Sequence, residues 1–236
     1  MRGMVRAVMI SLAVYLSPIT GPLASTAIAQ AVTILDETFE GDFPEYNGWH
    51  LVGSPTWEDV SSLAYAGGYS GYCAGTLSAQ GPYVPNMDAW MYYGPFSLAD
   101  AVAAQVTMMQ SYQCESGSDF IKYAVSTDGA TFRICNSYSG WNQGWTPLTL
   151  DLAATPLGNL CGQPQVWFAV IFTSDFSVEQ EGAYVDNIVI QKTLPSPIIR
   201  VIGDTDWGNV EVGSTVGMPI DIYNDGQLPL HVTGIT

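Results

Sequence analysis

Basic residues are scarce in this chain of 236 residues: six lysines and arginines stand against 22 aspartates and glutamates, which gives a formal net charge of −16. A surface this acidic repels the phosphates of nucleic acids and of anionic membranes, so neither is expected as a partner. The composition suits an exported protein that binds divalent cations. Solubility in strong salt is the competing explanation for the same excess of acids.

Signatures of several enzyme classes are also missing. The chain has two histidines, His50 and His231, and no GxSxG elbow, which disfavours a Ser-His-Asp mechanism. Neither an HExxH pair nor a phosphate-binding glycine loop is present. The sequence therefore predicts a protein that is not an enzyme. A glycoside-active enzyme is the lesser alternative, because only the fold decides whether two carboxylates face one another.

No apolar run reaches the length of about 18 residues that a membrane-spanning helix needs. Residues 1–30 combine a basic start at Arg2 and Arg6, an apolar stretch over 8–16 and small residues at 27 and 29, which is the pattern of a cleaved signal peptide. Cleavage would leave four basic residues against 22 acidic ones, a net charge of −18. We expect an extracellular or cell-surface protein that does not insert into the membrane after cleavage.

Zinc-type CxxC spacing is absent among the four cysteines, so a zinc site is not expected. The cysteines are Cys73, Cys114, Cys135 and Cys161. All of them lie in the exported part, and an even number in an oxidising compartment predicts two disulfides. Three pairings are possible. Proximity in the sequence favours Cys114 with Cys135, which leaves Cys73 with Cys161.

Helical periodicity is missing after the N-terminal segment, and residues 98–104 offer one helical turn at most. Short runs rich in Val, Ile, Tyr, Trp and Thr alternate instead with Gly, Pro, Asn, Asp and Ser, as in all-β domains. The Asp128-Gly129 pair predicts a tight hairpin. Strands are expected at 32–39, 48–52, 69–74, 89–93, 103–112, 119–126, 131–136, 146–152, 165–173 and 183–191. This number of strands predicts an all-β sandwich of two antiparallel sheets, a jelly roll, over residues 31–192.

Prolines at 195 and 197 make residues 193–197 a stiff linker. A second β pattern follows over 198–236, with strands expected at 198–201, 210–212, 218–223 and 230–233. Its segments 206–208 (DWG) and 224–226 (NDG) resemble the opening of ASH-type immunoglobulin-like domains. Because a sandwich of that class needs about 100 residues, we expect a partial domain and a larger chain with further domains.

Acidic side chains stand at both ends of the predicted sandwich. Asp186 interrupts an apolar strand that would place Tyr184 and Ile188 on one face and Val185 on the other. A buried carboxylate needs a partner. If the first and last strands pair, Ca²⁺ bound between them would satisfy Asp186 together with the acids near residue 40. Hydrogen bonds from backbone amides or a tyrosine are the alternative.

The order of several segments carries a family resemblance. These are Phe39-Glu40, DAWM at 88–91, GPFSL at 94–98, YAVSTDG at 123–129, VWFAVIF at 166–172 and YVDNI at 184–188. Residues 35–191 resemble the MAM-like jelly-roll modules of bacterial surface proteins, of the cleaved-adhesin and choice-of-anchor types. The resemblance implies a non-catalytic, often calcium-bound module. It maps Glu40 and Asp186 onto the calcium position and suggests Glu37 and Asp88 as further ligands.

Residues 136–145 form the candidate recognition surface. Tyr138, Trp141 and Trp145 stand there among amides, hydroxyls and glycines, groups that stack on sugar rings and hydrogen-bond to them. The alternative, favoured by the tendency of aromatics to bury, is that Trp145 packs inward and leaves the other two exposed. The leading hypothesis is an adhesive or accessory module with a structural calcium site that binds a glycan or a surface protein. A purely structural spacer or anchor segment is the alternative.

Overall fold

The computed structural model describes residues 30–44, 47–75, 82–195, 199–202, 211–214, 217 and 221–224. Ala31–Leu194 form one compact unit, and the described residues from Pro195 onward belong to a second. The described residues form strands and turns and no helix. None of them therefore belongs to a helix long and apolar enough to cross a membrane.

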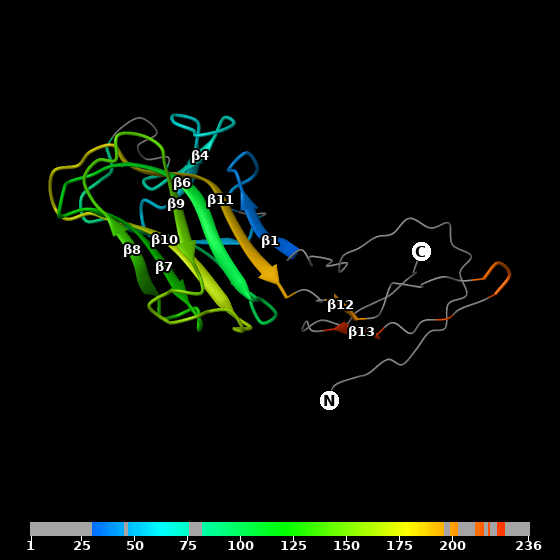
Figure 1. Cartoon of the computed structure of the whole chain (residues 1–236). Coiled ribbons are helices and arrows are strands. Elements are labelled where there is room, and N and C mark those ends of the chain that lie inside the picture. The colour runs from blue at the N-terminus through cyan, green and yellow to red at the C-terminus, as the bar shows by residue number, and fades with distance from the viewer. Residues whose placement is uncertain are drawn as a thin grey trace. The chain divides into compact units, whose positions relative to one another are not determined.

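The larger unit is a sandwich of two antiparallel sheets (Figure 1). One sheet has the order β3-β4-β11-β6-β9, with β1 also paired to β11, and the other has the order β2-β5-β10-β7-β8. The strands are β1 (Gln30–Glu37), β2 (Trp49–Val52), β3 (Glu58–Val60), β4 (Ser70–Tyr72), β5 (Asp88–Phe96), β6 (Ala103–Gln113), β7 (Phe120–Ser126), β8 (Arg133–Tyr138), β9 (Thr146–Asp151), β10 (Val166–Thr173) and β11 (Gly182–Leu194). The chain passes repeatedly from one sheet to the other, as in a jelly roll. The predicted all-β sandwich is confirmed.

Most local predictions hold. The Asp128-Gly129 hairpin is present, and the Asp128 carboxylate accepts the backbone amides of Ala130 and Thr131. The exception among the strands is β3, which was not predicted because two of its three residues are acidic. Residues 98–104, for which the sequence allowed one helical turn at most, contain a single non-helical turn.

The strand β11 lies inside the six-stranded sheet, with β6 along one edge and β4 and β1 along the other. The predicted pairing of the first and last strands is therefore confirmed. The register with β6 shifts between Asp186 and Val189, and Asn187 in this interval has a left-handed φ of 51°. Such a bulge inserts one extra residue and breaks the alternation of faces.

The bulge makes the predicted division of faces wrong. Val185 pairs with Gln110, whose side chain accepts the Tyr123 hydroxyl of the opposite sheet, so Val185 faces the core. Its neighbours Tyr184 and Asp186 therefore lie on the outer side of the sheet, away from the core between the two sheets. Beyond the bulge, Ile188 is fully buried on the core side. A carboxylate on the outer face thus lies only two residues from a core isoleucine.

Each sheet contributes one face to the main hydrophobic core. Phe168, Val170 and Phe172 of β10 are fully buried there. The alternate residues Ala169 and Ile171 belong to a separate, smaller cluster on the other face of the same strand. The five-stranded sheet therefore has apolar side chains on both faces.

The second unit is described by the antiparallel pair β12 (Ile199–Ile202) and β13 (Asp221–Asn224). Both overlap predicted strands. Residues 211–214, where a strand was expected to end, contain a turn. The strand expected at 230–233 and residues 1–29 of the signal peptide expected over 1–30 lie outside the described residues. The immunoglobulin-like assignment stays a prediction.

Candidate functional site

Asp186 is held by backbone amides. Its side chain is fully buried, and its Oδ2 accepts the N–H groups of Tyr65 at 2.9 Å and Ala66 at 3.1 Å. Its Oδ1 accepts the N–H of Asn187 at 2.7 Å. Burial raises the pKa of Asp186, the three N–H groups lower it, and the net result lies above the usual value. In the structure, Asp186 is thus satisfied by hydrogen bonds from backbone amides, which was the alternative to a calcium ion.

Glu40 meets the same loop, which we call the clamp loop and define as residues 63–69. Its Oε1 accepts the N–H groups of Gly68 at 2.8 Å and Tyr69 at 2.9 Å. Gly67 has a φ of +65°, and a Cβ there would lie 2.2 Å from Glu40 Oε1. The left-handed backbone therefore favours glycine, and a larger residue there would displace the Glu40 carboxylate from its place. The fold thus brings Glu40 and Asp186 to one loop, as the resemblance implied, and five amides donate to their oxygens.

The other two predicted metal ligands have different partners. The Glu37 carboxylate is almost fully buried and accepts Asn47 Nδ2 at 2.7 Å and Trp49 Nε1 at 3.0 Å. Asp88 lies on β5 in the opposite sheet and accepts Trp90 Nε1 at 2.6 Å. The structure does not bring Asp88 to the clamp loop. The metal roles of all four predicted ligands remain predictions.

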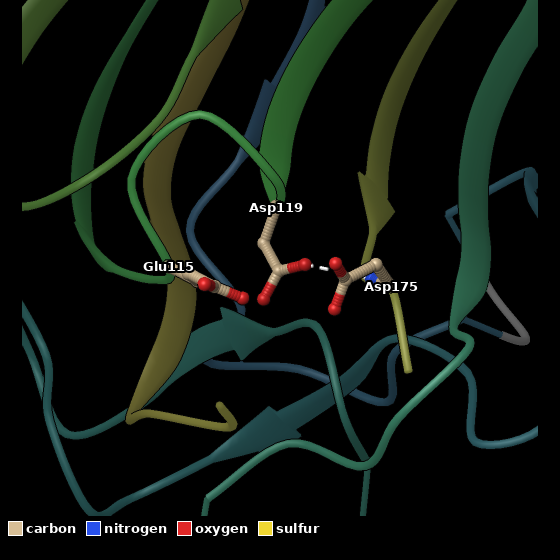
Figure 2. Close-up of side chains that lie close together, drawn as sticks. All are labelled: Glu115, Asp119 and Asp175. Carbon is tan, nitrogen blue, oxygen red and sulfur yellow. Dashed lines mark hydrogen bonds between the residues drawn. The ribbon is translucent and has the colours of Figure 1, made fainter. Parts of the chain in front are cut away.

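Three carboxylates that the sequence did not single out converge beyond the strand ends (Figure 2). Glu115 follows β6, Asp119 precedes β7 and Asp175 follows β10. One carboxylate oxygen from each lies within 4.8 Å of the other two. We call these residues the acidic triad. They come from both sheets, so the packing of the sandwich creates the group.

The triad is only partly satisfied by hydrogen bonds. Asp119 is fully buried; it accepts the Tyr83 hydroxyl and, at 2.7 Å, the N–H of Asp175. Glu115 Oε2 is buried without a hydrogen-bond partner. Burial, and then repulsion by Asp175 and Asp119, raises the pKa of Glu115. Hard cations prefer such oxygen donors, and the triad could hold a metal ion.

The sequence contained one weak sign of the triad. Glu115 and Asp119 enclose a Ser-Gly-Ser turn, and so short a turn keeps the two acids close together. Asp175 comes 56 residues after Asp119. Only the pairing of β7 with β10 brings it to the same place.

The three predicted recognition aromatics differ in their surroundings. Trp141 is 63% exposed. Tyr138 packs against Tyr112, with 6.0 Å between ring centroids. Trp145 is half-buried and meets Tyr65 edge to face at 5.9 Å, and its Nε1 is buried without a partner. The structure thus leaves Trp141 as the most open of the three rings.

The predicted disulfides are not present. The free cysteines are Cys73, Cys114, Cys135 and Cys161. Cys73 pairs with Ala183 at the start of β11. Cys161 precedes Gly162, whose N–H donates to Leu98 O. Leu98 lies shortly before β6, and the start of β6 pairs with the end of β11. A strand rises about 3.3 Å per residue, so the pairing of Cys73 with Cys161 far exceeds disulfide reach and is wrong.

Thiol titration tests this state of the cysteines. In denaturant without reductant, we expect four reactive thiols. In the folded protein at pH 8 we expect slow reaction, because burial raises the thiol pKa to about 11 for Cys114 and for Cys135, and only the thiolate reacts. Fewer than four thiols in denaturant would contradict the free state, and a count of zero would support two disulfides.

Comparison with known proteins gives structural similarity only. No family model and no curated protein matches the chain. The K3 cleaved adhesin domain of Lys-gingipain from Porphyromonas gingivalis is 17% identical, with 69% of this chain and 99% of that domain covered and a TM-score of 0.47. The structure of TmCBM61 in complex with β-1,4-galactotriose is 14% identical, with 65% and 93% covered and a TM-score of 0.44.

A third similar structure is the CBM22-1 xylan-binding domain of Xyn10C from Paenibacillus barcinonensis. It is 15% identical, with 71% of this chain and 98% of that chain covered and a TM-score of 0.42. At such identities and scores, none of these similarities assigns a ligand or an activity to this chain.

Proposed function

We propose that the chain is a non-catalytic glycan-binding module of an exported, extracellular or cell-surface protein. The observation that supports this is Trp141, whose 63% exposed ring stands on an immobilised loop. The next residue, Asn142, accepts the N–H of Tyr112 at 2.9 Å and donates to Gln110 O at 3.1 Å and Thr146 Oγ1 at 2.9 Å. Because these bonds hold the backbone beside Trp141, this segment loses little conformational entropy when a sugar stacks on the exposed ring.

Retention of the full chain on immobilised glycans tests this function. We expect Trp141→Ala to weaken retention about tenfold or more and Trp141→Phe to keep much of it, because the stacking face remains. Phe176, which is 77% exposed, is the matched control, and Phe176→Ala is expected to bind like the wild type. Retention on no glycan would contradict the proposal and favour a surface-protein ligand or a spacer.

We further propose that calcium binds the acidic triad as a structural ion. Support comes from Glu115 Oε2, a buried oxygen without a partner, beside two further carboxylates. Bound Ca²⁺ would neutralise the repulsion among them. The oxygens of Glu40 and Asp186, by contrast, already accept backbone amides. A calcium-dependent rise in melting temperature that Asp119→Asn removes would support the triad as the site.

A further inference from the structure

The outer face of the five-stranded sheet carries rings that the main core does not use. Trp90 and Tyr92 stand on β5, and Phe132 lies just before β8. The Phe132 centroid lies 5.6 Å from that of Trp90 and 5.7 Å from that of Tyr92. The imidazole of His50 on β2 stacks on Tyr92 at 5.0 Å with an interplanar angle of 22°. We call these four residues the aromatic face.

Small side chains lie beneath these rings. Ala124, Ala169 and Ile171 are at most 1% exposed and form a cluster with the aromatic residues above them. Two alanines in adjacent strands leave a shallow floor, so the rings cover it and are themselves only half-buried. The result is a continuous aromatic surface that extends from one edge strand, β2, across the sheet.

Polar groups flank the aromatic face. Asp88 accepts the indole N–H of Trp90 at 2.6 Å, which fixes the orientation of that ring. Lys122 donates to Thr173 Oγ1 at 2.9 Å, and Thr173 pairs with Asp88 across β10 and β5. Among the described residues, Lys122 and Asp88 are thus a cation and an anion that flank the face. In a chain of net charge −16, this local balance favours an uncharged ligand over either an anionic or a cationic one.

We infer that the aromatic face binds a neutral polysaccharide, whose sugar rings stack on Trp90 and Tyr92 while the flanking polar groups hydrogen-bond to its hydroxyls. The inference rests on the proposed glycan-binding function and adds a second surface to it, in a different strand and loop set from Trp141. An apolar ligand would leave Asp88 and Lys122 without a role in binding. A sugar presents an apolar face and a hydroxyl rim, which match the rings and the polar groups.

Affinity electrophoresis of the full chain through gels that contain xylan, β-glucan, mannan or galactan tests the inference. We expect Trp90→Ala and Tyr92→Ala to weaken retention about tenfold or more, whereas Trp141→Ala leaves a retained fraction that depends on Trp90. Melting temperatures of the variants control for folding. A second measurement needs no variant: the retained polysaccharide is expected to slow modification of exposed His50 by diethylpyrocarbonate, read by peptide mass spectrometry.

The outcomes separate the two claims. If the wild type is retained, Trp90→Ala and Tyr92→Ala are retained equally and His50 is not protected, the inference is overturned and the proposed function stands on Trp141. If the wild type is retained on no polysaccharide, the proposed function fails and the inference fails with it. Loss of retention in both folded variants, together with protection of His50, would establish the aromatic face.

Discussion

Replacement of Asp186 by alanine is expected to lower the free energy of unfolding by at least about 3 kcal/mol. The variant removes the buried Asp186 carboxylate, which is the acceptor of three partly buried amides, those of Tyr65, Ala66 and Asn187. Each unsatisfied buried donor costs about 1–3 kcal/mol. In a domain of this size, 1 kcal/mol corresponds to about 2–4 °C, so the melting temperature is expected to fall by at least about 6 °C. Thermal and urea unfolding of the full chain measure the change.

Two further variants make the test specific. Asp186→Asn keeps the volume and one acceptor oxygen but places an NH₂ group against the remaining amide donors, so an intermediate loss is expected. Asp36 is exposed and lies on β1, and Asp36→Ala is expected to change stability by less than about 0.5 kcal/mol. A stability of Asp186→Ala within about 1 kcal/mol of the wild type would show that these amides find water or other acceptors.

Calcium at about a hundredfold excess over its Kd is expected to raise the free energy of unfolding by about 2.7 kcal/mol, because a ligand of the folded state stabilises it by mass action. Asp119→Asn is expected to abolish this gain and to change the stability of the calcium-free protein little. The asparagine oxygen can still accept the N–H of Asp175, and its NH₂ can donate to the Tyr83 hydroxyl oxygen in place of the present bond. Thermal unfolding with Ca²⁺ and with EDTA measures both.

The controls locate the ion. Glu40→Gln is expected to keep the calcium response if the triad is the site and to lose it if the clamp loop is. Asp36→Asn matches the change of charge at an exposed position. Because burial and the neighbouring acids raise the pKa of Glu115, protons compete with the cation, and the response is expected to shrink as the pH falls from 7 toward 5. A response that every variant keeps would place the ion elsewhere.

Local pattern was enough to predict much of the fold. Alternation of apolar and polar residues, β-branched and aromatic runs, and the Asp128-Gly129 turn report on interactions between neighbours in the sequence. These features predicted the strands and the two-sheet sandwich. They also led to the hypothesis that the first and last strands pair, because an acid within an apolar strand needs a partner. Asp186 and Glu40 do meet one loop, with amide donors on their oxygens.

Features that depend on contacts between distant segments came only from the tertiary structure. The bulge after Asp186 places Ile188 on the core side together with Val185, and no alternation rule predicts an extra residue. Asp175 joins Glu115 and Asp119 because antiparallel pairing sets the ends of separate strands side by side. Trp90 and its neighbours face outward because the register assigns every second residue of β5 to that side. Residue types and their local order thus determined the strands, whereas register and packing decided which side chains share a site.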